Sequence, residues 1–253
     1  MHVVVTAATA AEWAPALQAL QQSGLPAAAS ETEGISLAGL PAETFMLRAP
    51  GPFGLRTPLR ISFHQSGVGM LATAFSLSKL IWGQRPDLII QAGIAGTFDT
   101  QCPLSKVFVV DNEYLGDTGV LENNVWRDLF DLKLEGADNA PFQNKALPNP
   151  WLPAYNLLQL PIVDGVTVNA ISTDPGQIAR LTEKYKPVLE SMEGAVLHYI
   201  CRETHTPFLQ LRAVSNYVGV RDKKQWSIGP AIAILNETLL ELIKRMDEER
   251  EDS

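Results

Sequence analysis

The chain has 253 residues, of which 46% are hydrophobic and 19% are charged, and this composition excludes a disordered or collagen-like chain. Such a length suits one large domain or two small ones, and it is enough to bury a full core without disulfides or metal ions. The formal net charge of −8 argues against binding nucleic acid through a clustered basic face.

Strand and helix signals alternate from the first residues onward. A β-branched run at 2–6 predicts a strand, and apolar side chains at helical spacing predict a helix over 11–22. Four prolines between residues 39 and 60 indicate strands broken by loops. The other elements predicted before residue 112 are strands at 61–63, 86–91 and 106–111 and a helix at 70–82.

The second half of the chain continues the alternation. Prolines in 135–156 predict a long excursion from regular structure. Beyond it we expect strands at 160–171, 188–190 and 208–214. We expect helices at 178–185, from the end of the 188–190 strand to about Arg202, and from Ile232 onward. This pattern predicts one α/β domain over 1–253, with a central mixed sheet flanked by helices on both sides. Ligands of such sheets bind at the carboxyl ends of strands, which directs attention to the residues after each strand.

The N-terminal apolar run is short and has no preceding Lys or Arg, so we interpret it as a buried strand rather than a signal peptide. No apolar run approaches the roughly 20 residues that a membrane-spanning helix needs. The two cysteines, Cys102 and Cys201, are too few for a disulfide framework. We therefore expect a cytoplasmic protein without a membrane partner.

Glycine or acidic groups follow several predicted strands. They are Glu12, SGVG at 66–69, GIAG at 93–96, SMEG at 191–194 and SNY at 215–217. Most also fit a purely structural interpretation, because Glu12 suits a helix dipole, the glycines permit tight packing and Asn216 suits a helix N-cap. Glu193 differs, since its carboxylate is costly to bury unpaired. Its expected partner is a vicinal diol or a neighbouring backbone terminus.

Several well-known catalytic motifs are missing from the sequence. There is no GxGxxG followed by an acidic residue, no P-loop and no GxSxG elbow. The four histidines show neither HxH nor HxxxH spacing, so no metal site is expected.

Taken together and in this order, the motifs resemble the nucleoside phosphorylase/nucleosidase superfamily. The 66–69 segment resembles its SGxG loop, and 93–96 resembles its Gly-rich loop beside the base. ESMEGA at 190–195 resembles its ribose motif, and RAVSN at 212–216 resembles its purine-recognition strand end. Within the superfamily, ESMEGA and RAVSNYVGVRDKKQW are similar to the futalosine hydrolases of the alternative menaquinone pathway. The resemblance covers nearly the whole chain.

Two departures from sister groups support this choice. Phosphorylases of the superfamily hold phosphate with an Arg before the Gly-rich loop and a Ser within it, where this chain has Gln91 and Ile94. Neither replacement neutralises a dianion as Arg does, so water is the expected nucleophile. Methylthioadenosine/S-adenosylhomocysteine nucleosidases carry Asp where this chain has Asn216. The amide of Asn216 suits a 6-oxopurine such as hypoxanthine.

The resemblance implies a site and a reaction. Glu12 and Asn216 are the implied catalytic residues, acting on water and on the purine edge, while Met192 and Glu193 hold the ribose. The implied contacts with the base and its loops are Gly67, Gly93, Ile94, Ala95, Gly96 and Ser191. The implied reaction is hydrolysis of futalosine to hypoxanthine and dehypoxanthine futalosine, with a nucleoside and water as partners and without cofactor or metal.

Alternatives remain open. They are a nucleosidase for methylthioadenosine/S-adenosylhomocysteine or inosine, and a non-catalytic nucleoside-binding or storage relative of the fold. By analogy with similar nucleosidases we expect a homodimer. The residue that stacks on the base is expected near 171–176. The candidates for binding a substrate carboxylate are Arg56, Arg60, His64, Lys106 and Arg221.

Overall fold

The computed structural model describes residues 1–23, 44–47 and 59–249. The strands are β1 (His2–Ala7), β2 (Thr44–Leu47), β3 (Leu59–Gln65), β4 (Leu88–Thr97), β5 (Val107–Leu115), β6 (Gly119–Glu122), β7 (Val125–Asp128), β8 (Leu147–Pro148), β9 (Ile162–Thr167), β10 (Leu189–Ser191) and β11 (Phe208–Tyr217). The helices are α1 (Ala14–Gln22), α2 (Met70–Gln84), α3 (Leu152–Tyr155), α4 (Pro175–Tyr185), α5 (Gly194–Glu203) and α6 (Ile228–Glu249), with short 3-10 turns η1 (Ala10–Glu12) and η2 (Lys223–Gln225).

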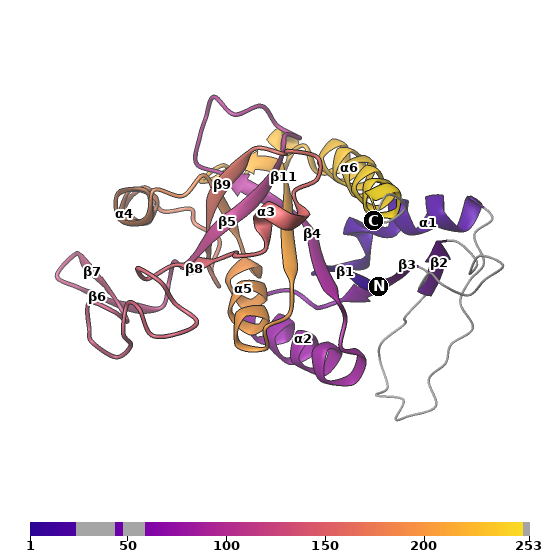
Figure 1. Ribbon diagram of the computed structural model, residues 1–253. Helices are drawn as coiled ribbons and strands as arrows, with labels where there is room; N and C mark the ends of the chain where they lie inside the picture. Colours follow the sequence, from indigo (N-terminus) through magenta and orange to yellow (C-terminus); the bar gives the residue numbers. More distant parts are fainter. Residues whose placement is uncertain (24–43, 48–58, 250–253) are drawn as a thin grey trace.

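A mixed sheet organises the described residues (Figure 1). Its strands lie in the order β10-β9-β5-β11-β4-β1-β3-β2, and β8 pairs with β5. At its centre, β1 runs parallel to β3 and β4, and β11 runs parallel to β4. In contrast, β5 is antiparallel to β11, and β10 is antiparallel to β4. The predicted α/β class with a mixed central sheet is confirmed.

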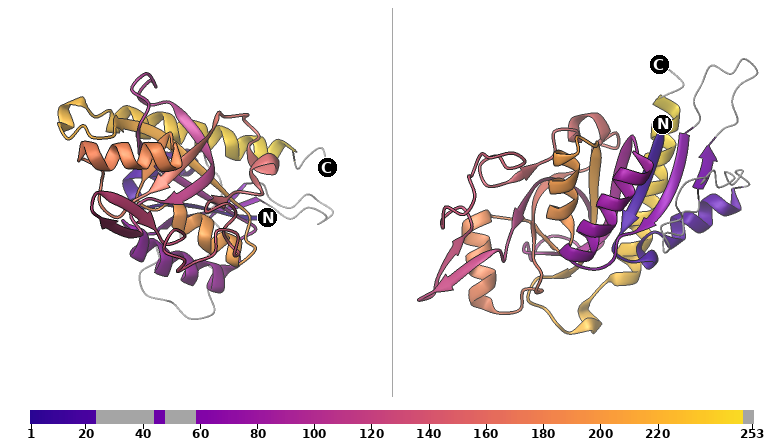
Figure 2. Two further views of the ribbon diagram at one scale, coloured as in Figure 1. Left: turned by 90° about the vertical axis from the view of Figure 1, so that its left-hand side faces the viewer. Right: turned by 90° about the horizontal axis from the view of Figure 1, so that it is seen from below.

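Helices cover both faces of the sheet, as predicted. Side chains alternate along β1, so that Val3 and Val5 pack with α1 and α6, whereas Val4 packs with α2 and α5. The turned views show α6 and α2 on opposite sides of the strands (Figure 2). The central strands are therefore buried on both faces, which explains their nearly continuous apolar sequences.

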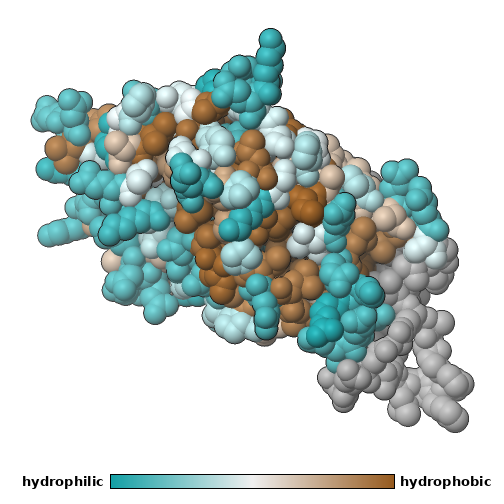
Figure 3. Space-filling model, turned by 90° about the horizontal axis from the view of Figure 1, so that it is seen from above, coloured by the Kyte–Doolittle hydropathy of each residue, from teal (hydrophilic) through white to brown (hydrophobic). Residues whose placement is uncertain are grey.

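Helix α6 is the long amphipathic C-terminal helix that the sequence predicts. Contrary to the sequence expectation, the segment Lys223–Glu249 is long and apolar enough, by length and composition, to cross a membrane. Its buried residues include Leu235, Leu239 and Ile243, which pack into the core of β1, β4 and β11. One face of α6 therefore packs against the sheet. Seen from above, apolar side chains gather near the middle of the molecule's surface, with polar side chains at the margins (Figure 3).

Three local differences from the sequence prediction have physical causes. The helix predicted over 11–22 is split, because Pro15 lacks an N–H and occupies the first turn of a new helix, α1. The hairpin β6–β7 was not predicted. Its turn consists of Asn123 and Asn124, which both take the positive φ angles that a two-residue hairpin turn requires, 49° and 62°. Strand β4 continues through 93–96, which the sequence analysis interpreted as a loop after the strand.

Candidate active site

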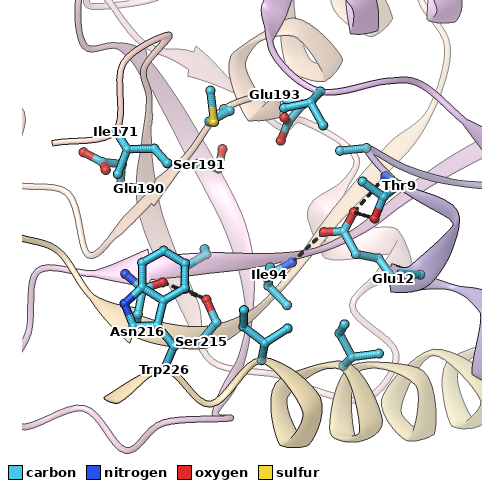
Figure 4. A pocket seen from close by; sticks show the side chains of 18 residues that line it. Thr9, Glu12, Ile94, Ile171, Glu190, Ser191, Glu193, Ser215, Asn216 and Trp226 are labelled. Carbon is cyan, nitrogen blue, oxygen red and sulfur yellow. Dashed lines mark hydrogen bonds between the residues drawn. The ribbon is translucent and has the colours of Figure 1, made fainter. Parts of the chain in front are cut away.

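A pocket of about 340 Å³ lies where β1, β4 and β11 end, beside the first turns of α5 and α6 (Figure 4). Eighteen residues line it, and three of them are the carboxylates Glu12, Glu190 and Glu193. None of the eighteen is Lys, Arg or His. Glu12 and Glu193 lie toward one end of the pocket in Figure 4, and Glu190 and Asn216 lie toward the other.

Glu12 is held by three hydrogen-bond donors. Its Oε2 accepts from the backbone N–H of Thr9 at 3.0 Å and from the Thr9 hydroxyl at 3.2 Å, and its Oε1 accepts from the backbone N–H of Ile94 at 3.1 Å. The first of these bonds, from the Thr9 backbone N–H, belongs to a capping box that starts η1. Both oxygens are thereby oriented, and the side chain is only 8% exposed. The carboxylate is preorganised at the pocket wall.

Glu193 binds a backbone N–H at a helix terminus, which is one of the two partners expected from the sequence. Its Oε1 accepts from the backbone N–H of Gly69, at the start of α2, at 2.9 Å. Gly69 has a φ of +84°, a conformation that glycine adopts without strain. Burial raises the pKa of Glu193; the Arg212 guanidinium and the Gly69 N–H oppose this rise, and the Glu12 carboxylate adds to it.

Arg212 lies buried beneath these carboxylates, and the sequence analysis assigned it no role of its own. Its Nη1 is 4.0 Å from the Glu193 Oε2, and its Nη2 donates to the Gln91 Oε1 at 2.6 Å. A Cβ at Gly93 would lie 2.3 Å from the Arg212 Nη1, so the glycine makes room for the guanidinium. Gln91 thus holds Arg212 and does not line the pocket.

A β-bulge shapes the other end of the pocket. The register of β11 against β4 shifts between Val214 and Asn216. A bulge breaks the alternation of a strand, which allows Ser215 and Asn216 both to line the pocket. The Asn216 Oδ1 accepts from the Ser215 hydroxyl at 2.8 Å, and its Nδ2 donates to the Tyr217 carbonyl at 3.2 Å. The second Nδ2 hydrogen remains for a ligand. Asn216 lies within β11, so the helix N-cap alternative was wrong.

The structure gathers most of the predicted site residues at this one pocket. Those that line it are Glu12, Ile94, Ala95, Gly96, Ser191, Met192, Glu193 and Asn216. Gly67 and Gly93 do not line it. Ile171, in the range expected for the stacking residue, does. The lining residues that were not predicted as site residues are Ala8, Thr9, Ala11, Val68, Glu190, Ser215, Trp226, Ile228 and Ile232.

None of the proposed carboxylate-binding cations that the structure describes lines this pocket. Arg60 contacts the His2 ring at 2.7 Å, and His64 bonds to Thr6 and Ser76. Lys106 lies over the Phe108 ring, and Arg221 lies over the Trp226 ring. Arg56 lies outside the described residues. Within 1–23, 44–47 and 59–249, no group of three or more His, Cys, Asp or Glu could hold a metal ion.

A buried carboxylate anchors the first turn of α5, next to Glu193. Glu113 accepts hydrogen bonds from the Gln210 amide at 2.8 Å and from the Thr167 hydroxyl at 2.9 Å. The Thr167 hydroxyl in turn accepts from the backbone N–H of Ala195 at 2.8 Å. Burial raises the pKa of Glu113 from 4.5 to about 7, against the effect of these two hydrogen bonds and of Arg212.

This pKa shift predicts how stability depends on pH. Because the folded-state pKa lies above the unfolded value, the contribution of Glu113 is fully present below about pH 4.5 and is lost as the pH rises through about 7. Glu113→Gln cannot ionise, and its amide suits both partners. We expect the Tm of the wild type to fall relative to that of Glu113→Gln between pH 5 and pH 8. Thermal melts across this range test it, and parallel Tm curves would contradict it.

Comparison with known proteins shows which proteins the chain resembles. No family model matches the chain. A futalosine hydrolase of Streptomyces coelicolor is 30% identical over 205 residues, covering 79% of this chain and 85% of that protein. A futalosine hydrolase of Thermus thermophilus is 25% identical, covering 72% and 80%. The solved structure of Arabidopsis thaliana 5′-methylthioadenosine nucleosidase superposes with a TM-score of 0.69 at 22% identity, covering 97% and 98%.

Proposed function

The chain belongs to the futalosine hydrolase family, and on that premise we propose that it hydrolyses the N-ribosidic bond of futalosine to hypoxanthine and dehypoxanthine futalosine. The reaction would serve the alternative route to menaquinone. The observation that carries the proposal is the arrangement of the pocket, with the carboxylates Glu12 and Glu193 at one end and the Asn216 amide, together with Glu190, at the other.

This division matches the charges that develop when an N-ribosidic bond breaks. The sugar becomes positive and the leaving purine becomes negative in an oxocarbenium-like transition state. Carboxylates beside the sugar and hydrogen-bond donors beside the base stabilise that state more than the ground state. Glu12 positions and deprotonates the attacking water, Glu193 accepts from the ribose hydroxyls, and Met192 packs against the ribose.

The Asn216 amide fits a 6-oxopurine. Its oxygen is occupied by the Ser215 hydroxyl, so its nitrogen faces the ligand as a donor. A 6-oxopurine offers acceptors at N7 and O6, whereas the exocyclic amine of adenine offers hydrogens. Asn216 therefore favours hypoxanthine as the leaving base and counts against methylthioadenosine as the substrate.

The lining residues favour water over phosphate as the nucleophile. A phosphate dianion in this pocket would meet three carboxylates and no Lys, Arg or His among the lining residues. Arg212, the nearby cation, is buried and engaged by Gln91. Chromatography of the products formed from futalosine, with and without phosphate, tests this point. We expect hypoxanthine and dehypoxanthine futalosine at equal rates in both. A requirement for phosphate, with a sugar 1-phosphate as product, would contradict it.

We also propose that the protein is a homodimer in the cytoplasm. Three apolar side chains on the outer face of α2 are exposed: Leu71 (86%), Phe75 (68%) and Trp82 (73%). Val68, just before α2, is 58% exposed and also lines the pocket, so this face adjoins the proposed site. An exposed apolar face of this kind marks an association surface. Both cysteines are free thiols, consistent with a reducing compartment.

A charge on this face of α2 should separate the protomers. We expect the wild type to have twice the 27.6 kDa mass of the chain and Phe75→Glu to have the monomer mass in multi-angle light scattering. The matched control is Leu134→Glu, because Leu134 is 77% exposed and belongs to the segment between β7 and β8 rather than to α2. It should remain a dimer. A monomeric wild type, or a dimeric Phe75→Glu, would refute the proposed interface.

A further inference from the structure

Glu190 lines the pocket with an acceptor that the protein leaves unsatisfied. The side chain is 7% exposed, and its Oε1 accepts from the backbone N–H of Ser172 at 3.1 Å. Its buried Oε2 makes no hydrogen bond of normal geometry with the described residues, and the Ser172 hydroxyl, which makes none either, opposes the rise that burial causes in the pKa of Glu190. A buried acceptor without a donor is costly, so such groups nearly always have a partner. The pocket thus offers a ligand donor a place to bind.

Glu190 and Asn216 flank Gly96 on the two strands that pair with β4. Glu190 on β10 and Asn216 on β11 are both in register with Gly96 of β4, which lies between them. Two strand spacings separate the two backbones by about 10 Å. A Cβ at Gly96 would come within 3.2 Å of the Asn216 Nδ2, so the glycine keeps this space open. Both side chains lie at the end of the pocket away from Glu12 (Figure 4).

The pair presents a donor and an acceptor in a fixed arrangement. The Asn216 Nδ2 donates, because the amide oxygen is held by Ser215, and the Glu190 carboxylate accepts. In hypoxanthine, N7 and O6 are acceptors and N1–H is a donor, in succession along one edge. In adenine, N1 is an acceptor and the 6-amino group is a donor. Hypoxanthine matches both side chains. Adenine can also accept from Asn216 at N7, but its N1 presents a lone pair instead of a hydrogen to the Glu190 carboxylate.

We propose that Glu190 is a specificity-determining residue that selects 6-oxopurines by accepting the hydrogen of N1–H, while Asn216 donates to the adjacent N7/O6 edge. This inference rests on the proposed function in assigning the base end of the pocket. Glu190 acts on binding of the base and takes no part in attack by water. A site built to pair a particular hydrogen discriminates strongly against an analogue that lacks it.

Binding of the free bases tests the inference without any turnover. Calorimetry with hypoxanthine and adenine would be run on the wild type, Glu190→Gln and Glu190→Leu. The charged acceptor becomes a neutral one in Glu190→Gln and is lost in Glu190→Leu. We therefore expect hypoxanthine to bind both variants more weakly, by about 10- to 100-fold and most in Glu190→Leu, and adenine to bind them no more weakly than wild type. Glu193→Gln is the matched control, since it makes the same change at the other end of the pocket. It should leave the hypoxanthine-to-adenine ratio unchanged.

The outcomes separate this inference from the proposed function. If both Glu190 variants keep the wild-type ratio of the two affinities, or lose affinity for both bases equally, the inference is wrong even where futalosine is hydrolysed. If the ratio collapses in the Glu190 variants alone, the inference stands even where the wild type prefers another 6-oxopurine nucleoside. Thermal melts of each variant show whether it is folded, and Glu190→Gln preserves the shape of the side chain.

Discussion

Glu12→Gln lowers kcat for futalosine by about 10²–10⁴-fold, the loss expected when a general base is removed, and leaves the affinity for hypoxanthine unchanged. The carboxylate lies at the end of the pocket away from Asn216, so it does not contact the base (Figure 4). The amide of glutamine cannot take a proton from water. Steady-state kinetics gives kcat, and calorimetry with hypoxanthine gives the affinity.

Thr9→Val is the control for this prediction. It removes one of the three donors that hold Glu12 but keeps the carboxylate and its bond to the Ile94 N–H. We expect a smaller loss of kcat than in Glu12→Gln, because the base remains and only its orientation loosens. A Glu12→Gln enzyme with kcat within about tenfold of wild type would exclude Glu12 as the general base.

Asn216→Ala lowers kcat for futalosine by about 10²–10³-fold, the usual effect of removing one donor aimed at developing negative charge. The Ser215 hydroxyl holds the Asn216 oxygen, so the donor is oriented before the substrate arrives. KM should change less than kcat, because the purine is more negative in the transition state than in the ground state. Kinetics of Asn216→Ala with futalosine measures both parameters.

Asn216→Asp tests whether Asn216 also selects the base, apart from stabilising the negative charge on the leaving purine. An aspartate keeps the size of the side chain but favours a 6-amino group over a 6-oxo group. We expect its activity to fall with futalosine and its relative activity to rise with methylthioadenosine. A loss confined to KM in Asn216→Ala, or an unchanged substrate preference in Asn216→Asp, would show that Asn216 only contributes to binding.

The order of the elements and the position of the site at the carboxyl ends of strands could be predicted from the sequence. Apolar runs such as 86–91 and the β-branched 2–6 have strong local patterns, because their strands are buried on both faces. The pairing of β10 with β4, and of β5 with β11, could not be predicted. Register between distant strands depends on contacts that no local pattern records.

The site residues that lie in recognisable sequence motifs were predicted. Those that reach the site only through tertiary contacts were not. Glu12, Glu193 and Asn216 lie in segments that resemble family motifs. Glu190 lies beside Glu193 in the same motif, but the sequence does not show that its Oε2 is buried without a partner. Gly93 was predicted to lie along the purine, yet it makes room for Arg212, whose position depends on the parallel pairing of β11 with β4.

The most direct test of the account compares kcat/KM for futalosine, inosine and methylthioadenosine, with chromatography of the released base. We expect futalosine to be the preferred substrate, hypoxanthine to be the released base and methylthioadenosine to be a poor substrate. Preference for methylthioadenosine would contradict the interpretation of Asn216 and make the chain a nucleosidase for adenine nucleosides. Absence of turnover with all three nucleosides, together with tight binding of hypoxanthine, would mean that it is a non-catalytic relative of the fold.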